Sequence, residues 1–520
     1  MRIDRIILVT TFIVFSLTGY SQQLKLRPVI DQVYEYETEL ILEEDDDIAF
    51  MINFDFGLTY TNKDLDFEIV LHDIKGSMSQ GYNNRAYFHT KNIAMENKRV
   101  QKLAKHIINK PLTFEVDSNG IVSKTYHLDI NDAEVEGILN QLTDKFGNKK
   151  INPLKDIQLK TGYNWSELDS FSFQKNKKLA VLVEHTIIEV NKEEVIVESR
   201  GIFKVKENQV HMGGTSIYDR KTGIQKLTKL MLNFGDRGNM YMLTKLQGYD
   251  YPPLIIDYQD LAFKKVYNNW YSADKYIDKA ALEFYPFQNN FSNSQIEAYS
   301  ESLEILSNNS NYQSISVYNT KMDTLYPTGS YIEVNNFYLH TPKGREVLKL
   351  IPGQEDYDSF SVGYLGEYYK DIYEPLPEGD TIEINLSLYI PTESRNLSLT
   401  KNNTKNKGIT AHFDKSAVVL SIPRKNYNTL LFNIYKAIRF YDADNKQLDA
   451  TYNFLYNQDV KLDDKYTPDE LIAIFNDKKR TGLPAVINME FKVKNAAKII
   501  IETHHKFKKY STIITKKISD

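Results

Sequence analysis

Acidic and aromatic side chains are interleaved between residues 356 and 374, and this mixture could bind or cleave sugars. The acids are Asp356, Asp358, Glu367, Asp371 and Glu374, and the tyrosines of the same stretch are Tyr357, Tyr364, Tyr368, Tyr369 and Tyr373. Aromatic rings offer platforms for sugar rings, and two carboxylates about 5 to 9.5 Å apart catalyse glycoside hydrolysis. Since spacing in sequence does not give that separation, we assign no catalytic residue. The candidate ligand-binding residues are Tyr364, Tyr368, Tyr369 and Tyr373. The alternative is a long loop that packs its tyrosines onto its own module.

Other signatures of catalysis or metal binding fail on spacing. Residues 213–216 lack the Gly-x-Ser-x-Gly pattern of a nucleophile elbow. His504 and His505 are adjacent in a predicted strand, so their side chains point to opposite faces and cannot chelate one ion together. The acidic run from Glu43 to Asp47 and the Asp442-x-Asp444 pair could supply oxygen ligands to calcium. Both are more typical of solvated turns, and we expect no metal and no cofactor.

The elements that must position these groups are mostly β-strands. From residue 33 to residue 129 polar and apolar residues alternate with period two, as in Tyr34, Tyr36, Thr38 and Leu40. Hairpin turns are predicted at Asp117–Gly120, at 191–192 and at 218–223. Helical spacing occurs at 100–108, at 135–146 and at 294–306, and a capping box with Thr467 and Glu470 begins another helix.

Three segments of the first half resemble a known group of proteins. They are the hairpin at Asp117–Gly120, the stretch Gly162-Tyr163-Asn164-Trp165 and the turn at 218–223. Together they are similar to uncharacterised exported β-rich proteins of Bacteroidota-type bacteria. The resemblance implies a β-rich exported domain and implies no particular activity.

The predicted fold class is α+β to mostly β, with an antiparallel-sheet N-terminal domain and a few helices, followed by two tandem β-sandwich-like modules. The N-terminal domain covers 23–262, and a mixed segment with one helix covers 263–311. The modules cover 312–401 and 408–520, the second with one inserted helix. An internal repeat supports them, because residues 337–344 align with 438–445 and residues 384–388 align with 487–491.

The N-terminus and the composition predict where the protein works. Arg2 and Arg5 precede an apolar run from Ile6 to Leu17, followed by small and polar residues, as in a secretory signal peptide covering 1–22. A membrane-spanning helix needs about 20 apolar residues, which this run does not reach. The chain contains no cysteine, which excludes disulfides, thiol catalysis and a cysteine-linked lipid anchor. We expect an exported protein, periplasmic or at the cell surface.

The net charge and the tyrosine content limit the classes of function that the sequence supports. The net charge of −5 gives no electrostatic reason to expect nucleic-acid binding. The chain contains 36 tyrosines, and this abundance suits either strand formation or an aromatic binding surface. We expect a non-enzymatic binding or envelope-structural protein whose partner is a glycan or an envelope protein. The alternatives are a glycan hydrolase that uses dispersed carboxylates, and a carrier that holds an apolar ligand in the N-terminal sheet.

Overall fold

The computed structural model describes most of the chain, and it divides into two compact units. The described residues are 24, 26–44, 47–81, 84–91, 104–117, 120–126, 159–174, 177–205, 208–258, 261, 293–308, 313–319, 331–350, 364–423, 438–455, 466–476 and 486–518. The first unit comprises Met1–Ala262, Asn309–Tyr312 and Tyr466–Thr481. The second comprises Phe263–Asn308, Gln313–Lys465 and Gly482–Asp520.

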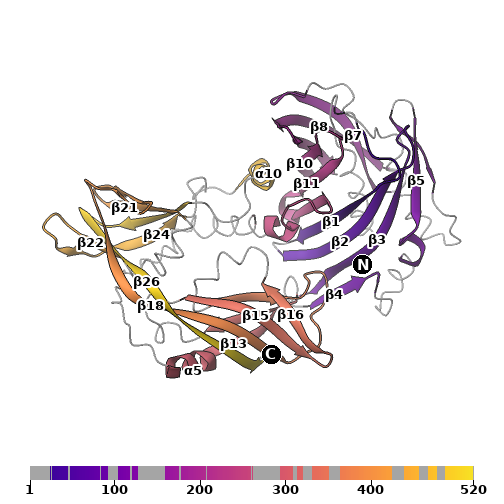
Figure 1. Ribbon diagram of the computed structural model, residues 1–520. Helices are drawn as coiled ribbons and strands as arrows, with labels where there is room; N and C mark the ends of the chain where they lie inside the picture. Colours follow the sequence, from indigo (N-terminus) through magenta and orange to yellow (C-terminus); the bar gives the residue numbers. More distant parts are fainter. Residues whose placement is uncertain are drawn as a thin grey trace. The chain divides into compact units, whose positions relative to one another are not determined.

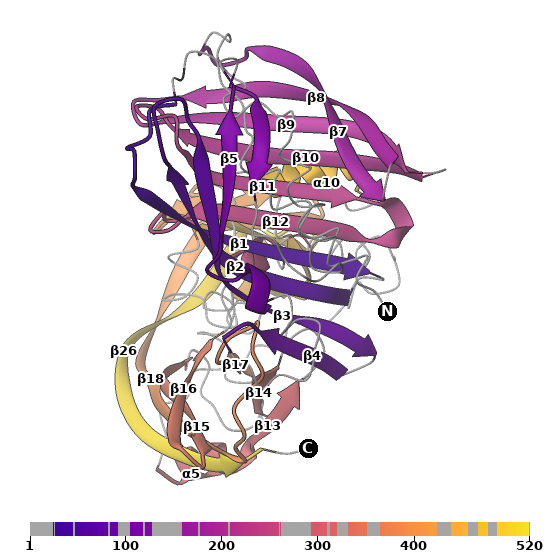
Figure 2. The ribbon, with the colours of Figure 1, turned by 90° about the vertical axis from the view of Figure 1, so that its right-hand side faces the viewer.

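The first unit is built on one twelve-stranded antiparallel sheet (Figures 1 and 2). Its strands are β1 Val33–Glu44, β2 Asp47–Tyr60, β3 Phe67–Gly81, β4 Asn84–His89, β5 Pro111–Val116, β6 Val122–Tyr126, β7 Asn164–Gln174, β8 Lys177–Val190, β9 Glu194–Val205, β10 Asn208–Asp219, β11 Gln225–Asn233 and β12 Asn239–Leu246. Their order is β6-β5-β3-β2-β1-β12-β11-β10-β9-β8-β7, with β4 paired to β3. The first and last strands of the sheet in sequence order therefore pair at its centre, and the sheet is strongly curved.

The hairpins of this sheet form where turn residues stand in the sequence. Gly120 has a φ of 77° in the turn between β5 and β6, a conformation that glycine adopts without a Cβ penalty. Gly223, with a φ of 71°, does the same between β10 and β11. Asn191 accepts hydrogen bonds from the backbone of Glu193 and Glu194 between β8 and β9. These local signals made the three predicted hairpins readable from the sequence.

One helix of the first unit comes from far along the chain. Helix α10, Pro468–Asn476, begins with the predicted capping box, in which the Thr467 amide donates to Glu470 Oε2 at 2.9 Å and the Glu470 amide donates to Thr467 Oγ1 at 3.3 Å. It packs on β10 and β11. Shorter helical pieces lie at 104–107, at 235–237 (η2, Gly235–Arg237) and at 254–258. The helix predicted at 135–146 falls outside the described residues.

The second unit contains a nine-stranded and a five-stranded sheet. The nine-stranded sheet has the order β13-β14-β17-β16-β15-β18-β26-β22-β23, with β13 Leu303–Asn308, β14 Ser314–Asn319, β15 Tyr331–Thr341, β16 Gly344–Leu350, β17 Tyr364–Tyr369, β18 Thr381–Thr400, β22 Ile438–Tyr441, β23 Gln447–Leu448 and β26 Lys498–Lys517. The five-stranded sheet has the order β19-β20-β21-β25-β24, with β19 Lys405–Asn406, β20 Ile409–Phe413, β21 Ala417–Pro423, β24 Thr451–Leu455 and β25 Val486–Lys492. Strands of both sheets share one hydrophobic core, which is a sandwich-like arrangement.

The predicted layout of two tandem modules is not confirmed. The 20-residue strands β18 and β26 pair along their full length, so the regions assigned to separate modules share one strand pair. The two halves of the proposed repeat also lie in different settings. Residues 337–341 in β15 pair with β18, which carries 384–388. Residues 438–441 in β22 and 487–491 in β25 lie in different sheets and do not pair.

The helix predicted at 294–306 is shorter in the structure. Helix α5 covers Asn293–Ser302, and the next six residues form β13, which pairs with β14. Leu303 fits both the helical and the strand period, Ile305 fits only the strand period, and both are buried, whereas Leu306 is exposed. Strand pairing therefore overrode the helical spacing. Among the described residues, no helix is both long and apolar enough to cross a membrane.

Candidate functional site

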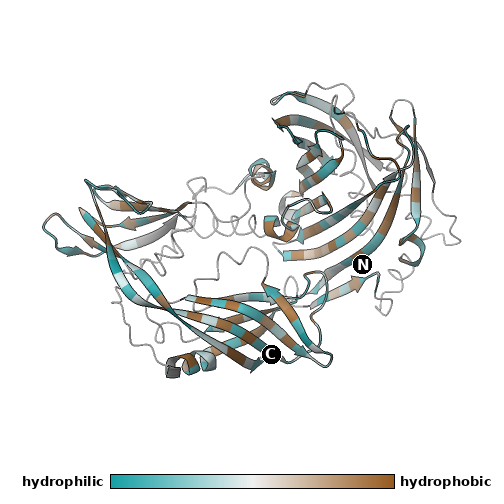
Figure 3. Ribbon diagram, in the orientation of Figure 1, coloured by the Kyte–Doolittle hydropathy of each residue, from teal (hydrophilic) through white to brown (hydrophobic). Residues whose placement is uncertain are grey.

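The twelve-stranded sheet has one face lined by apolar side chains from ten of its strands. Side chains of a strand alternate between the two faces, and in β1 the even-numbered residues from Tyr34 to Leu42 are uncharged, whereas Glu35, Glu37, Glu39 and Glu43 face the other way. Figure 3 shows the alternation of hydrophobic and hydrophilic residues along the strands. We call this side the apolar face. Its buried cluster consists of Tyr34, Tyr36, Leu40, Leu42, Phe50, Ile52, Phe54, Phe56, Leu58, Tyr60, Phe67, Ile69, Phe114, Val122, Val181, Val183, Phe203, Val210, Met212, Ile224, Leu232, Met240 and Met242.

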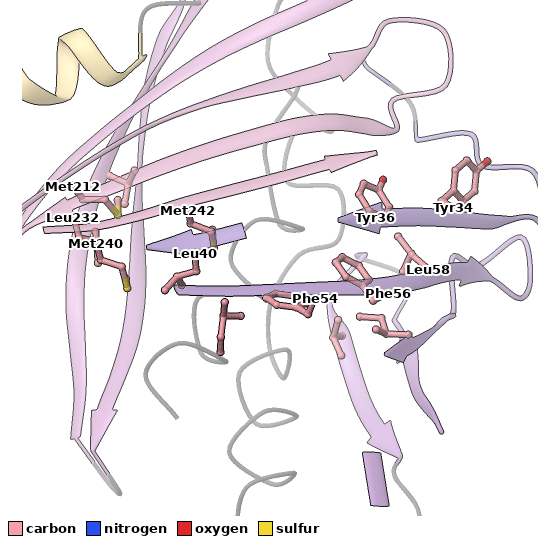
Figure 4. Close-up of a cluster of buried hydrophobic side chains, with 14 of the residues drawn as sticks. Tyr34, Tyr36, Leu40, Phe54, Phe56, Leu58, Met212, Leu232, Met240 and Met242 are labelled. Carbon is pink, nitrogen blue, oxygen red and sulfur yellow. The ribbon is translucent and has the colours of Figure 1, made fainter. Parts of the chain in front are cut away.

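Two zones of different chemistry lie along the apolar face (Figure 4). One is rich in methionine, with Met212, Met240 and Met242 beside leucines. The other is aromatic: the ring of Tyr36 stacks on that of Phe56, with centroids 5.3 Å apart. Methionine is flexible and polarisable and adapts to irregular apolar shapes, whereas aromatic rings give rigid contact area. The face therefore combines adaptable methionine side chains with rigid aromatic rings.

On β1, β10, β11 and β12, a row of hydroxyl side chains lies between the methionine-rich residues and the tyrosines of the aromatic zone. Ser216 of β10 pairs in register with Thr228 of β11, Thr228 pairs with Thr244 of β12, and Thr244 pairs with Thr38 of β1. The hydroxyl oxygens of Thr38 and Thr244 are 2.8 Å apart, and those of Ser216 and Thr228 are 3.0 Å apart. All four are uncharged and lie across four neighbouring strands. We call them the hydroxyl row; it is the polar part of the otherwise apolar centre of this face.

Burial shifts the pKa of two side chains on the same face. The Tyr36 hydroxyl donates to the carbonyl oxygen of Gln225 at 2.9 Å, and desolvation raises its pKa well above the ordinary value. Burial lowers the pKa of His185 to about 3, so the imidazole is neutral at pH 7. Its ring stacks on Trp165 at 4.9 Å, and Nδ1 lies 2.7 Å from Ser199 Oγ. Both side chains are therefore uncharged under ordinary conditions, in keeping with an apolar environment.

The opposite face carries helix α10, and we call it the helix-bearing face. Lys229 is buried there, with Nζ 3.0 Å from Asp257 Oδ2 and 2.8 Å from the Tyr251 hydroxyl. The ring of Phe475 lies 4.6 Å from the same ammonium group. Asp257 neutralises the Lys229 ammonium group, and the Tyr251 hydroxyl and the ring of Phe475 replace its water. These contacts explain how a buried lysine is tolerated under the helix.

Two buried carboxylates on the helix-bearing face accept hydrogen bonds from donors of the protein itself. Glu43 Oε2 accepts hydrogen bonds of 2.6 Å from both Asn239 Nδ2 and the Tyr241 hydroxyl. Glu39 Oε2 accepts from the amide of Leu254 at 3.0 Å. The acidic run that could have held calcium therefore begins with a side chain that binds protein donors. Among the described residues, no group of three or more His, Asp or Glu side chains could hold a metal ion.

The predicted tyrosine site becomes a strand in the structure. Residues 364–369 form β17, which pairs with β14 and β16. Tyr368 is 4% exposed, stacks on Phe337 at 4.0 Å and donates its hydroxyl to the Leu365 carbonyl at 2.8 Å. Tyr373 is also buried, and Tyr369 is half-buried. The side chain of Tyr364 lies outside the described part. The buried rings pack onto their own sheet, as in the alternative interpretation, and a glycan-binding role for the four tyrosines stays a prediction.

Two acids of the same segment accept hydrogen bonds from donors of the protein itself. Glu367 is buried and accepts hydrogen bonds from Asn308 Nδ2 at 2.8 Å and from the Ser314 hydroxyl. Asp371 Oδ1 accepts from the amide of Tyr373 at 2.9 Å in a local turn. Asp356 and Asp358 lie outside the described residues. His504 is buried and His505 is half-buried on the neighbouring position of β26, consistent with opposite faces.

Comparisons with known proteins give no close match. No family model matches the chain, and no curated protein matches it. One solved structure, described as "Lipid-protein interactions in lipovitellin", is similar with a TM-score of 0.28 and 12% sequence identity. That match covers 52% of this chain and 31% of the lipovitellin chain. A TM-score this low defines neither the fold nor the function of this chain.

Proposed function

We propose that this protein is a non-enzymatic carrier that binds an apolar ligand with an acyl-chain-like body against the apolar face. The observation that carries the proposal is the extent of that face: uncharged side chains from ten strands form one buried cluster. Every member lies in a strand except Ile224, which lies in the turn between β10 and β11. Among the described residues, the helices that pack on this sheet therefore contribute nothing to the cluster.

The chemistry of the face suits such a ligand. Burial of apolar surface contributes about 25 cal/mol per Å², so a long hydrocarbon chain gains affinity from contact area without specific hydrogen bonds. Met212, Met240 and Met242 can adapt to chains of different shape. The hydroxyl row offers donors and acceptors to an uncharged polar group such as an ester. An exported location, proposed from residues 1–22, would place the carrier among the lipids of an envelope.

A matched pair of variants tests the proposal. Met242, on the apolar face, and Met231, on the helix-bearing face, are both buried in the same sheet, with exposures of 1% and 0%. Met242→Gln and Met231→Gln each bury an amide of similar volume, which costs about 1–3 kcal/mol of stability in either place. Only Met242→Gln puts that amide on the proposed binding surface.

The measurement is the affinity for a fluorescent NBD-labelled fatty acid and an NBD-labelled phospholipid, with thermal melting in parallel. We expect saturable binding by the wild type, at least about tenfold weaker binding by Met242→Gln, and near wild-type binding by Met231→Gln. Met242→Leu, which conserves volume, should bind like the wild type. Equal effects of the two Gln variants, or no binding of either probe by the wild type, would contradict the proposal.

A further inference from the structure

Three large apolar side chains are exposed in one row on the helix-bearing face. Leu168 of β7 pairs with Leu182 of β8, and Leu182 pairs with Ile202 of β9. Their exposures are 75%, 53% and 50%. Single exposed apolar residues are ordinary, whereas these three lie side by side in direct register on one face, as the residues of an interaction surface do. We call these three residues the apolar row.

The apolar row continues the surface on which α10 is docked. Ile202 pairs with His211 of β10, and His211 Nδ1 lies 3.1 Å from Asp469 Oδ1 in the first turn of α10. Two residues further along β10, Gly213 lies under the helix residue Ile472, which a Cβ on the glycine would overlap. Therefore the row begins at the strand next to the one that α10 covers, on the same side of the sheet.

Among the described residues, the part of this face that no helix covers has about the width of one helix. Neighbouring strands lie about 4.8 Å apart, so the three strands from β9 to β7 span about 10 Å. A helix with its side chains is about 10–12 Å across. Strand β7 ends the order of this sheet among the described strands. A second helix placed beside α10 would therefore cover the apolar row.

We propose that the apolar row is the docking site for one amphipathic helix of a partner protein, lying beside α10 on the helix-bearing face. Charged side chains border the row. Glu184 of β8 and Arg200 of β9 stand opposite each other in register on one side, and Lys204 of β9 lies on the other. An apolar stripe flanked by polar positions on the partner helix would match this arrangement. A flat bilayer fits less well, because α10 stands above the strands next to the row.

The absence of cysteine makes a direct experiment possible. Glu184→Cys adds a single thiol at the border of the row, which can carry an environment-sensitive NBD label without other sites reacting. The probe is a synthetic peptide of residues 466–481, because the apolar stripe of α10 already packs on this face. A peptide of the same composition, scrambled so that the stripe is lost, is the control. Ile513→Cys, at a 67% exposed position of the second unit, is the control label.

We expect a saturable fluorescence increase at position 184 with the native peptide, and none with the scrambled peptide or at position 513. Ile202→Asp should weaken the affinity at least tenfold. Since β-branched threonine favours strands, Ile202→Thr tests the same contact if the aspartate variant does not fold. Equal responses to the two peptides, or no effect of either substitution, would overturn the proposal. A response to phosphatidylcholine vesicles alone would assign the row to a membrane surface instead. Loss of a concentration-dependent dimer in Ile202→Asp would assign it to a second copy of the chain.

Docking of a helix at the apolar row does not require the apolar ligand. The binding assays with the Met242 and Met231 variants report on the apolar face, whereas the label at position 184 reports on the opposite face. A lipid carrier without a helix-binding row, or a helix-binding protein without a lipid, would each be recognised by these separate measurements.

Discussion

Ile472 of α10 occupies the space that a side chain on Gly213 would need. A Cβ built on Gly213 would lie 1.9 Å from Ile472 Cγ2 and 3.1 Å from its Cβ. Ile472 is buried, with an exposure of 1%. The two residues are far apart in sequence, and the contact holds a helix of the C-terminal half against the N-terminal sheet. Gly213, which begins the stretch 213–216 that lacks the nucleophile-elbow pattern, thus has a packing role.

Gly213→Ala should therefore lower the free energy of unfolding of the first unit by about 1–3 kcal/mol, the usual cost of overpacking. The branched side chain of Ile472 cannot rotate away freely in a helix. Ile472→Ala opens the space but loses core contacts. The double variant should be less destabilised than the sum of the two single variants, as measured by urea unfolding. Strict additivity would show that the two residues do not compete for the same space.

Removing one partner of the Lys229–Asp257 pair should be costly. Asp257→Ala leaves a buried ammonium group with the Tyr251 hydroxyl and the ring of Phe475, and we expect a loss of about 3–5 kcal/mol. Lys229→Met removes the charge and keeps much of the side-chain volume. The double variant Lys229→Met, Asp257→Ala should then be more stable than Asp257→Ala alone. Denaturant unfolding of the three variants measures this, and a double variant less stable than Asp257→Ala would contradict it.

His185 should make the protein less stable in acid. Burial lowers its pKa to about 3 in the folded state, whereas the ordinary pKa of an imidazole exposed to water is 6.5. Between pH 7 and pH 5 the unfolded chain takes up this proton and the folded protein does not, so folding stability falls by about 2 kcal/mol from this group. The loss begins near pH 6.5 and continues until the pH approaches 3.

His185→Phe keeps a ring against Trp165 and removes the titration. We expect its stability to fall less than that of the wild type between pH 7 and pH 5, by about the same 2 kcal/mol. Other groups titrate in both proteins and cancel in the comparison. Urea unfolding at the two pH values is the measurement. Identical pH dependence in the two proteins would show that His185 is accessible to protons in the folded state.

Tyr368 and Tyr369 should behave differently although they are neighbours. Tyr368→Ala removes a buried ring that stacks on Phe337, and we expect a loss of about 3–5 kcal/mol. Tyr369→Ala, at a half-buried position on the other side of β17, should cost less. Thermal melting compares the two variants. A screen of Tyr369→Ala against glycans tests the remaining part of the predicted tyrosine site, since weaker glycan binding without unfolding would support it.

Much of the local structure could be predicted from the sequence. The hairpin turns followed from Gly120, Gly223 and Asn191, and the capping box of α10 followed from Thr467 and Glu470. The two faces of β1 were also visible, since tyrosine, threonine and leucine alternate with glutamate from Tyr34 to Glu43. These features depend on neighbouring residues and on the fixed periods of strands and helices, so the sequence alone contains them.

The candidate site depended on tertiary structure, because its parts meet through strand pairing. The four members of the hydroxyl row come from β1, β10, β11 and β12, and the register that aligns Thr38 with Thr244 joins residues 206 positions apart. The apolar row and the packing of Ile472 on Gly213 are set in the same way. The tyrosines of 364–373 illustrate the converse, since pairing of β17 with β14 and β16 decided which ring is buried. Sequence determined which side chains each strand presents to its two faces, and only the folded sheet decided which of them lie together, because register and burial are properties of chain segments that meet in space.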